Sequence, residues 1–95
     1  MFSFAITEDH ISEGNERNDK GTIGPRNTTL TFDEIVNHPD GKVFKMFDDD
    51  EILYYTGVMI EDEDSSGFEP LECFGMPNAG ATSIHYLENG KFIEL

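Results

Sequence analysis

The chain has 95 residues and carries 20 acidic side chains against six basic ones, which gives a formal net charge of -14. A protein with this charge repels nucleic acid and anionic membrane surfaces, so the partners it attracts are cations and basic proteins. Phe, Ile, Leu and Val make up about a quarter of the chain, enough for one small core and above the level typical of intrinsic disorder. We therefore expect a single compact domain over residues 1–95.

The first half of the sequence predicts a strand, a long loop and a helix. In "FSFAIT" apolar residues alternate with small or polar ones, which is the period of a strand with one buried face. Residues 7–29 are mostly polar and are interrupted by glycine and proline, so they predict a long loop. Thr31 and Glu34 have the spacing of a capping box, and a short helix is expected to follow Thr31 and to end at "PDG".

The second half predicts two hairpins and a helical turn. "KVFKMF" and "ILYYTGVMI" are rich in aromatic and β-branched residues, and the acids between them are expected to form a turn. Pro70 is placed to open a helical turn and Gly75 to end it. In "IHYLENGKFIEL" the pair Asn89-Gly90 favours a type I′ turn. The expected fold class is α+β, with a small antiparallel sheet of four to five strands and one or two short helices.

Two acidic clusters flank the apolar stretch 52–60. The first consists of Asp48, Asp49, Asp50 and Glu51, and the second of Glu61, Asp62, Glu63 and Asp64. If the stretch is one strand, the clusters lie at its two ends, roughly 30 Å apart. Solubility of a small domain needs a net charge of only about 2 to 8 in magnitude, so the excess indicates a partner. We expect both clusters to contact that partner, with Tyr54 or Tyr55, whichever faces solvent, as an aromatic anchor.

No metal site, cofactor or catalytic residue is expected. Residues 62–73 approach the spacing of a calcium loop, but Cys73 stands where a bidentate Glu is required and Pro70 interrupts the loop. Cys73 and His85 do not have the spacing of a zinc site. None of the three histidines belongs to a recognisable nucleophile motif, and no glycine-rich phosphate loop is present. These patterns favour a binding protein over an enzyme.

Three stretches, "DDDEILYYTG", "FEPLECFGMPNAG" and "IHYLENGKFIEL", resemble the small acidic accessory proteins of phages and plasmids. Characterised proteins of that kind include anti-CRISPR and anti-restriction inhibitors, some of which mimic DNA. The resemblance implies an inhibitor without catalytic residues. Independently of it, proteins that bind DNA gain much of their affinity by neutralising phosphates, and a surface dense in carboxylates can satisfy the same lysines and arginines.

The expected function is therefore inhibition of a basic nucleic-acid-binding protein or complex, plausibly by nucleic-acid mimicry, with no direct contact to nucleic acid or membrane. The first residues lack the basic region of a secretory signal, so we expect a cytoplasmic protein, in a bacterial host cell if a phage or plasmid encodes it. One alternative is an antitoxin or immunity-type protein that neutralises a basic toxic enzyme. Another is a divalent-metal-binding protein or small enzyme.

Overall fold

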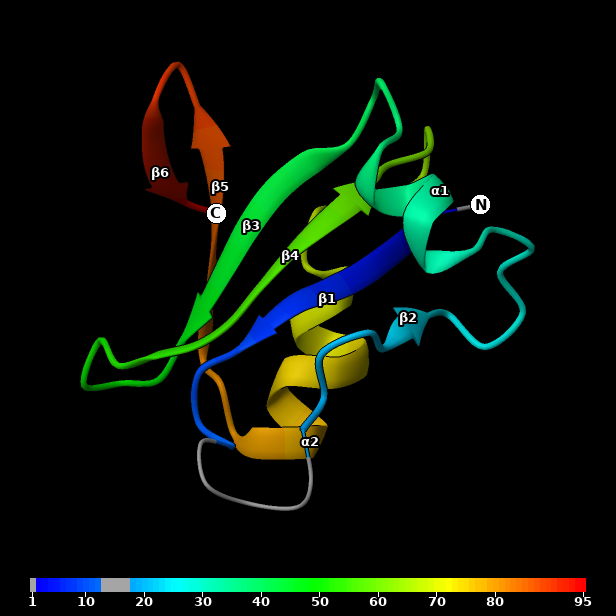
Figure 1. Ribbon diagram of the computed structural model, residues 1–95. Helices are drawn as coiled ribbons and strands as arrows, with labels where there is room; N and C mark the ends of the chain where they lie inside the picture. The colour runs from blue at the N-terminus through cyan, green and yellow to red at the C-terminus, as the bar shows by residue number, and fades with distance from the viewer. Residues whose placement is uncertain (1, 13–17) are drawn as a thin grey trace.

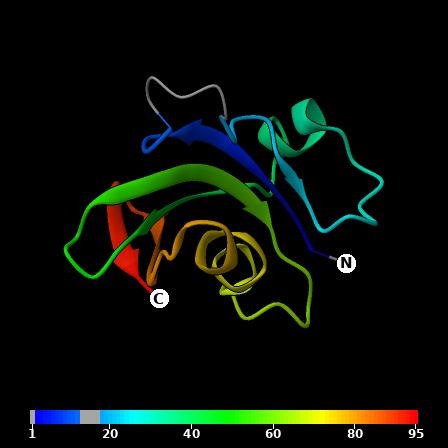
Figure 2. The same cartoon turned by 90° about the horizontal axis from the view of Figure 1, so that it is seen from below.

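The protein is an antiparallel sheet with short helices on both faces (Figures 1 and 2). The structure is a computed structural model, and it describes residues 2–12 and 18–95. The strands are β1 (Ser3–Asp9), β2 (Ile23–Gly24), β3 (Lys42–Phe47), β4 (Leu53–Ile60), β5 (Ser83–Glu88) and β6 (Lys91–Glu94). The helical segments are α1 (Phe32–Val36), η1 (Leu71–Gly75) and α2 (Met76–Ala79). The α+β class with a small antiparallel sheet is confirmed.

Within the described residues the sheet has six strands in the order β2-β1-β4-β3-β5-β6, which exceeds the four to five expected. The additional strand β2 lies inside the stretch 7–29 that was predicted to be a loop, and β1 also extends into that stretch. The segment around β2 folds back onto β1 through Ile6. The Ile6 N–H donates to the Thr22 carbonyl, and the Ile6 carbonyl accepts from the Gly21 N–H. A strand as short as β2 leaves no periodicity in the sequence. Residues 13–17 of the predicted loop lie outside the described residues.

Each face of the sheet packs on different helices, as Figure 2 shows. The larger cluster of buried side chains lies on the side of η1 and α2 and consists of Phe4, Ile6, Phe44, Met46, Tyr55, Met59, Leu71, Ala81, Ile84 and Tyr86. On the opposite side α1 packs against β1 and β4, and Ile35 is buried there with Ala5 and Val58. Figure 1 shows α1 over the upper ends of β1 and β4, so no helix of the described part of the chain covers that side of β3, β5 and β6.

The helix after Thr31 forms as predicted, with both halves of the capping box. The Glu34 N–H donates to Thr31 Oγ1 at 3.2 Å, and the Thr31 N–H donates to Glu34 Oε1 at 2.9 Å. The prediction that Gly75 ends the second helix is wrong, because the helical segment continues through α2. Gly80, which has φ +79°, caps its C-terminal end. Gly75 is small for a packing reason, since a Cβ there would lie 2.5 Å from Met46 Sδ.

The turn of the terminal hairpin depends on backbone conformation alone. Asn89 and Gly90 have φ of +51° and +81°, as the predicted type I′ turn requires. No heavy atom lies within 4 Å of a Cβ built on Gly90, so a side chain there meets no steric obstacle. A substitution at Gly90 therefore reports on backbone strain and not on packing.

We expect Gly90→Val to lower the free energy of unfolding by about 1 kcal/mol or more, because a β-branched residue is disfavoured at positive φ. For a domain of this size that corresponds to a thermal midpoint about 4–8 °C lower. Gly90→Asn is the matched control, since Asn tolerates this conformation, and it should lose much less. Equal midpoints for the Val and Asn variants in thermal unfolding followed by circular dichroism would contradict the turn assignment.

Candidate functional site

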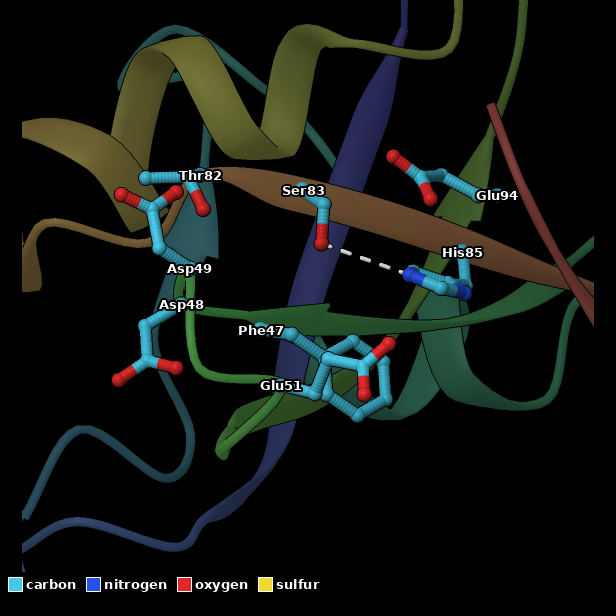
Figure 3. Close-up of a pocket in the computed structure, with 8 residues that line it drawn as sticks. All are labelled: Phe47, Asp48, Asp49, Glu51, Thr82, Ser83, His85 and Glu94. Carbon is cyan, nitrogen blue, oxygen red and sulfur yellow. Dashed lines mark hydrogen bonds between the residues drawn. The ribbon is translucent and has the colours of Figure 1, made fainter.

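A hollow of about 550 Å³ opens between the β3–β4 turn and the β5–β6 hairpin (Figure 3). Its lining residues are Phe47, Asp48, Asp49, Glu51, Thr82, Ser83, His85 and Glu94. We call it the acidic hollow, because four of these side chains are carboxylates and none is a lysine or arginine. In Figure 3 Asp48 and Asp49 lie on one side of the view and Glu94 and His85 on the other. Acids from two separate hairpins therefore line one hollow.

Asp48 closes the turn that carries the first cluster. Its Oδ1 accepts the backbone N–H groups of Asp50 and Ile52, both at 2.9 Å, and its carbonyl accepts from the Glu51 N–H at 3.1 Å. Side-chain-to-backbone bonds of this kind are the reason that Asp favours turns. Asp49 has no comparable bond among the described residues and is exposed. Asp48 thus builds the turn, whereas Asp49 leaves its carboxylate to solvent or to a partner.

Glu51 occupies an unfavourable backbone position. Its φ is +61°, in the left-handed region where this kind of hairpin turn ordinarily carries glycine. A residue with a side chain costs about 1 kcal/mol or more there. The Glu51 side chain is exposed and lines the acidic hollow. The turn would be more stable with glycine at this position, so the turn does not account for a glutamate there. An interaction of the Glu51 carboxylate with a partner would account for it.

The opposite wall of the acidic hollow comes from β5 and β6. Ser83 pairs with Phe47 across the β3–β5 ladder, and Glu94 pairs with His85 across the β5–β6 ladder. The His85 ring packs on Phe47 with centroids 4.6 Å apart. Cross-strand partners share a face of the sheet, so all four side chains lie on the side that carries no helix at this end. The wall combines hydrogen-bonding groups with one carboxylate.

Ser83, His85 and Glu94 contain the side-chain types of a serine nucleophile site, but their geometry differs from one. Ser83 Oγ and His85 Nε2 are 3.4 Å apart. An activated nucleophile also needs a third group that orients the base, and among the described residues no ion pair joins His85 to Glu94. The three side chains therefore place hydrogen-bonding groups and one negative charge on the wall of the acidic hollow.

The second acidic cluster lies at the other end of β4, as the sequence predicted, and does not join the acidic hollow. Glu61 makes an ion pair with Lys42 at 3.4 Å and lines a second hollow of about 210 Å³. Asp62 accepts the Asp64 N–H at 3.0 Å and the Ser65 hydroxyl at 2.8 Å, which closes a tight turn. Glu63 is exposed, as is Asp64. The two clusters are separate surfaces.

Of the two tyrosines, Tyr55 does not face solvent. It is 1% exposed, and its hydroxyl donates to Asp19 at 3.1 Å and accepts from the Asn78 amide at 3.1 Å. Burial is the main cause that raises the pKa of Tyr55 to about 12, and the Asp19 carboxylate adds to it. Tyr55 is therefore a core residue that ties the described part of the 7–29 stretch to α2, and its candidacy as an anchor is withdrawn.

Tyr54 lies beside the first cluster and is half-buried. Loss of hydration is the first cause that raises the pKa of Tyr54, followed by its hydrogen bond to the Asp48 carboxylate and the charge of Asp50. The β3–β4 register shifts at this point, so that Phe47 pairs with Leu53 and Tyr54 falls in the irregularity. Tyr54 packs against the larger core cluster and is the less buried of the two tyrosines.

Sequence reasoning missed the β5 and β6 side of the acidic hollow. Ser83 and His85 alternate with the buried Ile84 and Tyr86, so the sequence indicates that they share one face of their strand. It contains no signal that β5 pairs with β3, because that pairing joins segments far apart in the chain. Without that pairing, Glu94 could not be placed near the first cluster.

Comparison of the chain with protein-family models, with curated proteins and with solved structures finds no match. Within residues 2–12 and 18–95, no group of three or more His, Cys, Asp and Glu side chains is arranged to hold a metal ion. The same residues form no helix of the length and apolar character needed to cross a membrane.

We expect Glu51→Gly to raise the free energy of unfolding by about 0.5–1 kcal/mol relative to Glu51→Gln, because both remove the charge but only glycine relieves the positive φ. Urea unfolding of the two variants measures this difference. The pair is matched in charge, so repulsion among the acids of the turn cancels. A Gly variant no more stable than the Gln variant would show that the backbone at this position is unstrained.

Proposed function

We propose that the protein is a non-enzymatic acidic binding protein that inhibits a basic nucleic-acid-binding protein by occupying its nucleic-acid site. The observation that carries this proposal is the acidic hollow, which acids of the β3–β4 turn and of β6 line together. Its volume of about 550 Å³ lies in the range of ligand pockets. A lysine or arginine side chain entering it meets several negative charges at once.

The hydrogen-bonding groups of the acidic hollow suit a guanidinium group best. A guanidinium presents N–H donors in a planar fork that matches carboxylate geometry, and bidentate pairs of this kind are among the stronger hydrogen bonds. Asp49, Glu51 and Glu94 are exposed and accept no hydrogen bond that ties them to the described chain. The hydroxyls of Thr82 and Ser83 add further acceptors. The three carboxylates are available to a partner without loss of an existing hydrogen bond, whereas Ser83 Oγ already contacts His85 Nε2.

Inhibition would follow from competition for the same cations. Nucleic-acid-binding sites gain affinity from lysines and arginines that neutralise successive phosphates. The clusters at the two ends of β4 present carboxylates at separated points of a hydrogen-bonded sheet. A partner that binds both would have its phosphate contacts occupied. Association should be fast at low ionic strength and should weaken steeply as salt increases.

We expect the combined change Asp48→Asn, Asp49→Asn, Asp50→Asn and Glu51→Gln to weaken capture of the partner about tenfold or more, since the attractive charges are lost. The wild-type protein is immobilised, a bacterial lysate is passed over it at low ionic strength, and bound protein is eluted first with salt and separately with a duplex DNA. Asn can still accept the backbone bonds of the turn through its Oδ1, so the fold should be retained.

The matched control changes Glu8, Asp33, Asp40 and Glu72 to their amides, which removes the same charge at exposed positions away from the acidic hollow. The control should keep most of the affinity. Equal loss in both variants would mean that only net charge matters. A captured protein that resists elution by DNA would contradict mimicry and would favour an immunity-type inhibitor of a basic enzyme. A captured protein that DNA releases should lose its DNA binding in a gel-shift assay when the wild-type protein is added.

A further inference from the structure

Strand β6 forms an open edge of the sheet. It pairs with β5, and among the described residues no strand lies on its other side (Figure 1). The Leu95 N–H donates to the Ile84 carbonyl at 3.0 Å, and Ile93 pairs with Tyr86. Residues in an antiparallel strand turn their backbone groups alternately to the two sides. The N–H and C=O of Phe92 and Glu94 must therefore point outward, away from β5.

The edge has a hollow on each side of the sheet. The side chain of Glu94 borders the acidic hollow, together with His85, its cross-strand neighbour. The second hollow is lined by the apolar or aromatic side chains of Tyr86, Ile93 and Leu95 and by polar and charged ones, namely Lys42, Glu61, Ser66, Glu88 and Glu94. Ile93 is 50% exposed and Leu95 is 49% exposed. The edge thus presents carboxylates to both hollows, since Glu94 lines both, and exposed apolar side chains only to the second.

We propose that β6 pairs with an extended basic segment of the partner, which adds a further strand to the sheet. This inference rests on the proposed function and specifies how the partner is held. The added strand would run antiparallel to β6, as every other neighbouring pair in the sheet does. Strand addition uses main-chain hydrogen bonds for affinity and alternate side chains for specificity.

The register determines which side chain goes to which hollow. A residue opposite Glu94 shares its face of the sheet and therefore points toward the acidic hollow. Lysine or arginine fits there, beside the carboxylates of the β3–β4 turn. A residue opposite Ile93 points to the other side, where β-branched apolar residues can pack on Ile93 and Leu95. The preferred segment therefore alternates basic and apolar residues.

Charge distinguishes this occupant from a second copy of the chain. Two copies each carry a net charge of -14 and would bring their acidic hollows close together across a shared edge. In an antiparallel pair of β6 strands that joins Phe92 to Glu94 of the other copy, the only cation among the described residues close to each Glu94 on its face of the sheet would be Lys45, which already lies 4.3 Å from the centre of the Phe92 ring. A basic segment removes that repulsion.

The test uses a capped octapeptide in which Arg and Val alternate, and two N-methylated forms of it. In the proposed register the backbone N–H groups of the Arg residues face β6 and those of the Val residues face solvent. Methylation of the Arg amides should weaken binding about tenfold or more, because the main-chain bonds are lost. Methylation of the Val amides should change the affinity by about twofold or less. All three peptides carry the same charge.

Amide hydrogen exchange supplies a second readout on the protein. On saturation with the unmodified peptide, exchange of the Phe92 and Glu94 amides should slow, whereas the Ile93 amide is already bonded to β5 and should change little. If both methylated peptides bind like the parent and those two amides stay unprotected, strand addition is wrong and the acidic surface acts by charge alone. If no peptide binds even at low ionic strength, the proposed function is also overturned. A salt-independent dimer with the two amides protected in the absence of peptide would show that a second copy covers the edge.

Discussion

Mutual repulsion among carboxylates is the constraint on which the arrangement of this protein depends. A chain with 20 acids and six bases cannot place its acids close together inside a small domain without a large penalty. Among the described residues the buried side chains are accordingly apolar or neutral, and the acids lie in turns, near strand ends and on the short helices, where water screens them. The sheet separates these turns and so sets the distances between groups of charge.

Several acids relieve this repulsion by accepting backbone hydrogen bonds. The Asp9 carboxylate accepts the N–H groups of Ile11, Ser12 and Asp19, and Glu69 accepts those of Ser66 and Gly67. Burial acts to raise the pKa of both carboxyls, but these hydrogen bonds outweigh it and the pKa of each is lowered. A carboxyl whose pKa is lowered by folding stabilises the folded state at pH values above its ordinary pKa. This stabilisation is lost as the pH falls through the lowered pKa.

Hydrogen bonds to the backbone separate the acids that build the fold from the acids that are free to bind a partner. Asp9, Asp48 and Asp62 each hold a turn together through hydrogen bonds to neighbouring residues. Asp49 and Glu51 hold nothing together in the described chain, and Glu51 even occupies a strained backbone position. Their carboxylates face the acidic hollow with Glu94. Charge that costs stability and supports no turn is the physical basis for proposing a partner.

Local patterns were sufficient to predict most of the fold. Alternation and aromatic content identified five strands, and Thr31 with Glu34 identified α1. Gly75 was misread as a helix end, because glycine serves equally where a helix must approach a strand closely, as it does against Met46. The first cluster was found from the sequence alone. Its neighbours on β5 and β6 were not, because long-range pairing of strands leaves no local signal.

The most direct measurement of the central claim is an NMR titration of the protein with N-acetyl-arginine amide. A single guanidinium probe carries the chemistry that the acidic hollow is proposed to recognise, without the size of a whole partner. The account predicts that the largest amide shift changes occur at Asp49, Glu51, Ser83, His85 and Glu94. Shift changes spread evenly over exposed acids, with Asp33 and Asp40 affected as strongly as Glu51, would contradict a site at the acidic hollow.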